Sequence, residues 1–132
     1  MTLGLLGIIS DNVSSSYIQE LTVWNKHMGY AGRLDFVGEW NGVPAVIEFK
    51  TSTRKKYGRA AENCSLQASA YALAHNSLFK TDIDTIVTLV AVVDGQVQVI
   101  EECAENFFEM LAERVDKYHQ LLRESVQEGN QA

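Results

Sequence analysis

An Asn-Gly pair between two runs of strand-forming residues is the feature that most restricts how this chain can fold. Asn41-Gly42 tolerates the positive φ that a two-residue type I′ turn needs, and such a pair is a strong hairpin signal. The flanking residues, 30–40 and 43–50, are therefore predicted to form an antiparallel hairpin. Counting away from the turn, its register brings the carboxylates of Asp35 and Glu48 opposite each other on one face.

Patterns along the rest of the chain alternate between those of strands and those of helices. Residues 84–93 are β-branched and nearly all apolar, as in a strand buried on both faces, and Asp94-Gly95 offers a second tight turn. An Ala-rich run and a later run with helical apolar spacing favour two helices. The apolar residues 2–9 are expected to form a short helix that packs on the core. The other expected elements are strands at 21–28, 30–40, 43–50, 84–93 and 96–101, a loop at 51–59, and helices at 60–75 and 104–128. This order predicts an α/β fold with a mixed central sheet flanked by helices.

The length and composition are those of one compact domain. The chain has 132 residues, 46% of them apolar, so residues 1–132 can form a core without disulfides. Cys64 and Cys103, expected to be buried thiols, belong to no metal-binding cluster, which favours a reducing compartment. The apolar opening lacks a basic segment and is far shorter than the roughly 20 residues that span a bilayer. We therefore expect a cytoplasmic domain without a membrane segment.

Charge is distributed unevenly along the chain. The net charge of −6 argues against a protein that coats nucleic acid nonspecifically. Residues 51–60 nevertheless contain cations, no acid and one aromatic side chain: Arg54, Lys55, Lys56, Tyr57 and Arg59. Such a segment is either an ordinary solvated loop or an attractive site for a polyanion, where the tyrosine could stack on a base.

The facing carboxylates of Asp35 and Glu48 have two interpretations. Like charges placed opposite each other are destabilising unless a cation lies between them or one is protonated, and Lys50 points the same way as Glu48. A divalent ion held by oxygen ligands beside an ammonium can hydrolyse a phosphodiester, because the metal lowers the pKa of a bound water. Charged residues on one hairpin face are also commonly just solvated, so spacing alone leaves both readings open.

The predicted helix that follows adds two polar side chains. Gln67 and Tyr71 are four residues apart, hence on one helix face, beside the loop that follows Lys50. In isolation such residues usually lie at the surface or the core edge. Next to an acidic pair and a lysine they could position a phosphate or a base.

These residues together resemble the PD-(D/E)xK nuclease superfamily, and within it the RecB-like exonuclease group that includes the mitochondrial genome maintenance exonuclease and many phage relatives. Residues 29–35, Gly-Tyr-Ala-Gly-Arg-Leu-Asp, look like the family's Gly-x-x-Asp strand. Residues 47–52, Ile-Glu-Phe-Lys-Thr-Ser, look like its (D/E)xK strand, and residues 67–71, Gln-Ala-Ser-Ala-Tyr, like its QxxxY helix. The resemblance covers roughly residues 20–75 and implies a restriction-endonuclease-like αβββαβ core.

The resemblance also implies a role for each matching residue. Mg²⁺ or Mn²⁺ would be bound by Asp35, Glu48 and the backbone carbonyl of Phe49, and Glu20 is similar to an upstream acid that can complete such a site. Lys50 would be the catalytic lysine. Gln67 and Tyr71 would organise the site or contact the substrate strand. Apart from the resemblance, the charge and the aromatic ring of the basic segment make its side chains the candidate DNA-binding residues: Arg54, Lys55, Lys56, Tyr57 and Arg59.

The implied activity is metal-dependent hydrolysis of DNA by an exonuclease acting on single-stranded or end-containing DNA. An endonuclease or nickase with the same core is one alternative, and a nucleic-acid-binding subunit that does not cut is another. Relatives usually carry a helical region before the first strand, which is minimal here, so the core could form a homo-oligomer, act with a protein partner or cut without an end. The resemblance implies recombination or repair, and a phage-encoded protein would work in its host's cytoplasm.

Overall fold

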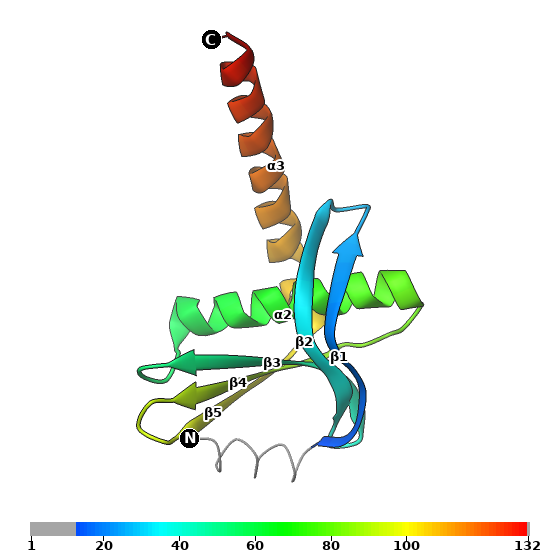
Figure 1. Cartoon of the computed structure of the whole chain (residues 1–132), viewed down its shortest axis with the longest axis vertical. Helices are drawn as coiled ribbons and strands as arrows, with labels where there is room; N and C mark the ends of the chain where they lie inside the picture. Colours follow the sequence, from blue (N-terminus) through cyan, green and yellow to red (C-terminus); the bar gives the residue numbers. More distant parts are fainter. Residues whose placement is uncertain (1–12, 132) are drawn as a thin grey trace.

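One mixed five-stranded sheet organises the fold (Figure 1). The computed structural model describes residues 13–131, with side chains described for residues 21–126. Strands β3 and β4 run parallel, and the other neighbouring strands are antiparallel. The elements are β1 (Val13–Asn25), β2 (Tyr30–Trp40), β3 (Val43–Ser52), α2 (Gly58–Phe79), β4 (Thr85–Val92), β5 (Val97–Cys103), η1 (Ala104–Phe107) and α3 (Phe108–Gln131). The predicted fold class is confirmed: a mixed sheet flanked by helices, consistent with a restriction-endonuclease-like core. The helix expected at 2–9 lies outside the described residues.

The predicted hairpin is confirmed in both its turn and its register. Asn41 and Gly42 have φ values of 51° and 82°, the left-handed conformations that a type I′ turn requires. Next to the turn Trp40 pairs with Val43, and the pairing continues without a shift as far as Phe36 and Ile47. An unbroken register matters here because one slipped residue would turn every side chain to the opposite face.

The prediction for the first strand was wrong at both ends. A strand was expected over residues 21–28, whereas β1 is longer at its start and ends at Asn25. The Asn25 side-chain oxygen accepts the Met28 N–H at 3.1 Å, and its backbone carbonyl accepts the Gly29 N–H at 2.8 Å. Asparagine often closes turns in this way, so residues 26–29 leave the strand and lead into β2.

Helix α2 crosses one face of the sheet between β3 and β4 and builds the main core. It is longer than the expected 60–75 and ends where Lys80 adopts a left-handed φ of 57°. Its Ala68 and Ala72 pack with Val37 and Val46 of the sheet. On the opposite face, Ala45 and Ile47 belong to a second buried cluster, as the alternation in β3 predicted. The sheet is therefore buried on both faces at its centre.

Helix α3 corrects part of the predicted C-terminal helix. The first turn, η1, is a 3-10 helix, and the apolar stripe expected to face the core packs only through its early residues, among them Leu111. Tyr118, Leu121 and Leu122 are 59%, 54% and 45% exposed. The helix is longer than the surface against which it packs, so its later half projects away from the sheet (Figure 1). No helix in the described part of the chain is both long and apolar enough to cross a membrane.

The two cysteines differ in their surroundings. Both are free thiols, and Cys64 on α2 is buried as expected. Cys103 is exposed, which corrects the expectation that both are buried. It is the last residue of β5, the strand at one edge of the sheet.

Candidate active site

Asp35 and Glu48 connect β2 and β3 where the regular strand pairing stops. Beyond the pair formed by Phe36 and Ile47, the Asp35 N–H donates to Glu48 Oε1 at 3.0 Å. In return, the Phe49 N–H donates to Asp35 Oδ2 at 3.0 Å. Each carboxylate therefore satisfies a backbone donor of the opposite strand. The arrangement places the two carboxyl groups side by side, within range of a direct interaction between the two side chains.

Glu48 is a buried acid. Its side chain is 3% exposed. The pKa of Glu48 is raised to about 8, chiefly by burial. The side chain and the charge of Asp35 contribute to this rise, while the Asp35 N–H and the Lys50 ammonium oppose it. A buried carboxyl with a raised pKa accepts a positive charge favourably, because a cation at the carboxylate would restore its ionised form.

A chain of hydrogen bonds links the strand to helix α2. The Lys50 ammonium donates to Gln67 Oε1 at 2.6 Å, and Gln67 Nε2 donates to the Tyr71 hydroxyl oxygen at 3.0 Å. Gln67 thereby orients both of its partners through one amide group. The structure thus brings Lys50, Gln67 and Tyr71 together, on the side of the sheet that also carries the two carboxyls.

Tyr71 is held against a glycine of β2. A Cβ added at Gly32 would lie 3.2 Å from Tyr71 Cζ and overlap the neighbouring ring carbon. Burial raises the pKa of Tyr71, and the negative charges of Glu48 and Asp35 add to the rise although the Gln67 hydrogen bond opposes it. The hydroxyl therefore lies within electrostatic range of both carboxyls, at a depth that only glycine at position 32 permits.

We predict that Gly32→Ala displaces Tyr71 and lowers the free energy of unfolding by about 1–3 kcal/mol, the usual cost of overpacking. In a Tyr71→Ala background the same substitution has no ring to meet, so its cost should nearly vanish. Chemical denaturation of the four proteins of this double-mutant cycle measures the coupling. Equal costs of Gly32→Ala in both backgrounds would show that the ring does not rest on this glycine.

The oxygen atoms of this site that could bind a metal fit a hard divalent cation in part. Carboxylate and carbonyl oxygens are the ligands such cations prefer, and Asp35 and Glu48 supply adjacent carboxyls. The residues described contain no group of three or more His, Cys, Asp or Glu side chains that could hold a metal ion. The Glu20 side chain is outside the described set. Its backbone, however, lies between Gln19 and Leu21, which pair with Phe36 and Leu34, so it runs beside Asp35.

The basic segment is anchored to the far strand. The Lys56 N–H donates to Gln98 Oε1 at 2.7 Å, and Gln98 Nε2 donates to the Lys56 carbonyl at 2.7 Å. Lys56 is half-buried, whereas the other members of the segment are exposed: Arg54, Lys55, Tyr57 and Arg59. Because this segment directly follows β3, its cations lie at the same end of that strand as Lys50. Nothing in the sequence predicted that Gln98 would bind the backbone of this segment.

A groove beside Gln67 and Tyr71 was not anticipated. It has a volume of about 400 Å³ and runs between β2, α2 and α3. Arg114 and Tyr118 line it from α3, and Arg114 Nη1 donates to Asn63 Oδ1 at 3.0 Å. The four-residue spacing of the arginine and the tyrosine was visible in the sequence, but nothing there showed that this helix face would meet the Gln67 side of α2.

Comparisons with known proteins support the fold. The chain matches no protein-family model, and no curated protein matches it. Among solved structures it resembles "Putative exonuclease" from Eubacterium rectale, with a TM-score of 0.58 and 11% identity over 92% of this chain. The chain spans about half of that protein, 51% of its length. It also matches the structure of SSO0001, with 20% identity and a TM-score of 0.47 over 88% of this chain and 56% of the other. The first of these likenesses shows that the two chains share a fold.

Proposed function

We propose that this chain is a metal-dependent nuclease that hydrolyses phosphodiester bonds of DNA, with an exonuclease on single-stranded or end-containing DNA as the favoured activity. The observation that carries the proposal is the constellation of Asp35, Glu48 and Lys50, continued through Gln67 to Tyr71. A structural likeness to an exonuclease-named protein agrees with it. If these charged residues were merely solvated, Glu48 would not be buried, and the two carboxylates would not each accept a backbone N–H from the opposite strand.

Asp35, Glu48 and the backbone carbonyl of Phe49 would hold Mg²⁺ or Mn²⁺, with Glu20 as a further ligand. When bound, such an ion neutralises charge on the phosphate and lowers the pKa of a water molecule. The protein's own contribution is to place two carboxyls together and to keep one of them, Glu48, out of bulk water.

Lys50 would stabilise the negative charge that develops on the phosphate. Its ammonium is directed by Gln67, so little reorganisation is needed when the substrate arrives. Tyr71 accepts its hydrogen bond from Gln67, which leaves the phenolic proton available to a phosphate oxygen. These two donors would orient the scissile phosphate against the carboxyl pair.

The DNA would run across this centre between the basic segment and the groove. The basic segment offers exposed cations on one side of Lys50, and on the other side Arg114 and Tyr118 offer a cation and an aromatic ring. Phosphate contacts and base stacking are how single strands are held without sequence preference.

Alanine at all four basic positions of this segment is expected to flatten the salt dependence of DNA binding. Four lost phosphate contacts correspond to a change of about 3 in the slope of log K against log salt concentration. Titrations at several salt concentrations measure that slope. The residues replaced are Arg54, Lys55, Lys56 and Arg59.

The matched control for this prediction removes the same charge elsewhere and should keep the wild-type slope. Its alanines replace four exposed cations outside the basic segment: Lys26, Lys80, Lys117 and Arg123. Equal slopes in the two variants would remove the basic segment from the binding surface.

Cleavage of end-labelled DNA tests the proposed function. Wild type and Asp35→Asn are compared on linear single strands, linear duplex and closed circles, with Mn²⁺, Mg²⁺ or EDTA. Progressive shortening of linear substrates, stopped by EDTA and by the substitution, is the expected result. Cutting of closed circles would show an endonuclease or nickase instead. DNA binding without cleavage, equal in both proteins, would show a non-catalytic binding subunit and overturn the proposal.

A further inference from the structure

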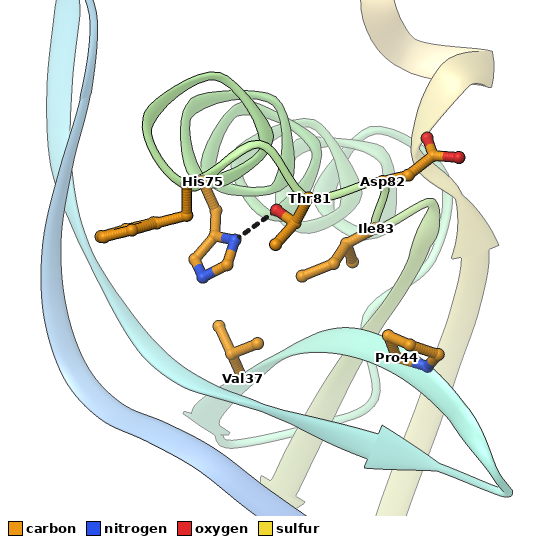
Figure 2. Close-up of a pocket in the computed structure, with 7 residues that line it drawn as sticks. Val37, Pro44, His75, Thr81, Asp82 and Ile83 are labelled. Atoms are coloured by element: carbon orange, nitrogen blue, oxygen red, sulfur yellow. Dashed lines mark hydrogen bonds between the residues drawn. The ribbon is translucent and has the colours of Figure 1, made fainter.

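A second cavity lies at the other end of α2 from the basic segment (Figure 2). It has a volume of about 490 Å³, within the range of small-molecule sites. Val37, Pro44 and Ile83 form apolar walls, and His75 and Phe79 of α2 complete them. His75 is one helical turn beyond Tyr71, but none of the residues that line this cavity belongs to the proposed active site.

His75 brings an unused polar atom into this apolar cavity. Its side chain is 4% exposed. Nδ1 is bonded to Thr81 Oγ1 at 2.8 Å, whereas Nε2 is buried and has no hydrogen-bond partner. Among the described residues this is the one buried side-chain nitrogen or oxygen left without a partner. In Figure 2 the ring turns Nδ1 toward Thr81 and the other nitrogen toward the cavity. A buried polar atom without a partner is costly, so a ligand that satisfied it would gain affinity.

The hydrogen bonds around His75 determine which ring nitrogen carries the proton. Asn76 Oδ1 accepts the Ile83 N–H at 2.8 Å, which identifies it as the amide oxygen, and it also accepts the Thr81 hydroxyl at 2.8 Å. Since the Thr81 proton is used there, Thr81 Oγ1 must accept from His75, and Nδ1 carries the proton. Burial lowers the pKa of His75 and favours the neutral ring. Nε2 is therefore a lone-pair acceptor.

The lining of the cavity therefore determines which kind of ligand can bind. The occupant must donate a hydrogen bond to Nε2 and otherwise be apolar. The Phe79 ring is 48% exposed and stands 4.8 Å from the His75 ring, between centroids, so an aromatic ring has a flat partner at the entrance. Asp82 lies exposed on the lining and disfavours anions.

We propose that this cavity is a binding site for a small neutral phenol, whose ring packs among Val37, Ile83 and Phe79 and whose hydroxyl donates to His75 Nε2. The inference does not depend on the proposed nuclease activity, since it uses none of the same side chains.

Three probes of similar shape test the site on the wild-type chain. p-Cresol carries the donor, 4-methylanisole has the oxygen without its proton, and toluene has neither. Binding is followed by NMR of backbone amides around the cavity and of the His75 ring nitrogens. We expect p-cresol to bind about tenfold more tightly than 4-methylanisole, the usual effect of one hydrogen bond. The ring nitrogens should report a neutral His75 with the proton on Nδ1, and a shift at Nε2 on addition of p-cresol.

N-acetyltyrosinamide presents the same phenol on a peptide unit. Binding of p-cresol without it assigns the cavity to a free small molecule, and binding of both extends the site to tyrosine side chains. Either result supports the phenol site. Equal affinity for p-cresol and 4-methylanisole, a proton on Nε2, or no binding of any probe would overturn it.

Two variants test whether the preference for p-cresol arises at His75. His75→Phe keeps an aromatic ring but removes the acceptor, and should abolish the preference for p-cresol over 4-methylanisole while both still bind. Phe79→Leu, at the entrance, should weaken both probes and keep the preference. A preference that persisted in His75→Phe would place the phenol elsewhere. Because the probe comparison uses wild type, the proposal stays testable if a variant fails to fold.

Discussion

Replacement of Lys50 by methionine is expected to lower the single-turnover rate of DNA cleavage by about 10²- to 10³-fold, the usual cost of removing one preorganised donor at a developing charge. Methionine keeps most of the aliphatic length, so the change is chiefly the loss of the ammonium. In wild type that ammonium is held by Gln67 Oε1 at 2.6 Å. The rate is measured with enzyme in excess and saturating Mn²⁺.

Two further variants separate charge from position. Lys80→Met removes an exposed ammonium just after α2, away from the carboxyls, and should cleave at the wild-type rate. Gln67→Leu keeps the Lys50 charge but removes the group that orients it, so an intermediate rate is expected. Thermal unfolding shows whether each variant is folded. Full activity in a folded Lys50→Met protein would remove Lys50 from the catalytic centre.

In EDTA, Glu48→Gln is expected to make the chain more stable at pH 8 and to leave its stability nearly unchanged below pH 4.5. The pKa of Glu48 rises from 4.5 to about 8 on folding, chiefly because the side chain is buried. Between these values the folded chain holds a proton that the unfolded chain has released. The wild-type free energy of unfolding therefore falls as pH rises, by at most about 1.4 kcal/mol per pH unit from this group.

Glutamine cannot ionise, so this contribution to the pH dependence should disappear in the variant. It can also accept the Asp35 N–H as Glu48 does. Urea unfolding at half-unit pH intervals gives both curves, and their difference isolates the one carboxyl. Glu113→Gln, which removes an exposed carboxyl on α3, is the matched control. Parallel curves for wild type and Glu48→Gln would show that Glu48 is ionised in the folded chain without a metal.

Local chemistry made the hairpin and its carboxyl pair predictable. Asn41-Gly42 sets the turn conformation, and the period of two along β2 and β3 then determines which side chains share a face. The spacing of Gln67 and Tyr71 likewise placed them on one helix face. The first strand was mispredicted at both ends, and at its C-terminal end this was because the Asn25 side chain diverts the backbone into a turn that apolar patterning does not register.

The amino-acid sequence by itself determined the α/β class and the hairpin register, since the order of strand and helix patterns and the Asn-Gly turn are written in local stretches of residues. Only the tertiary structure decided that Tyr71 rests on Gly32, that Gln98 anchors the basic segment, and that α3 projects with exposed apolar residues. It also left His75 Nε2 without a partner in an apolar cavity. These features depend on which surfaces meet across the chain, and residues far apart in sequence carry no local pattern that records their contact.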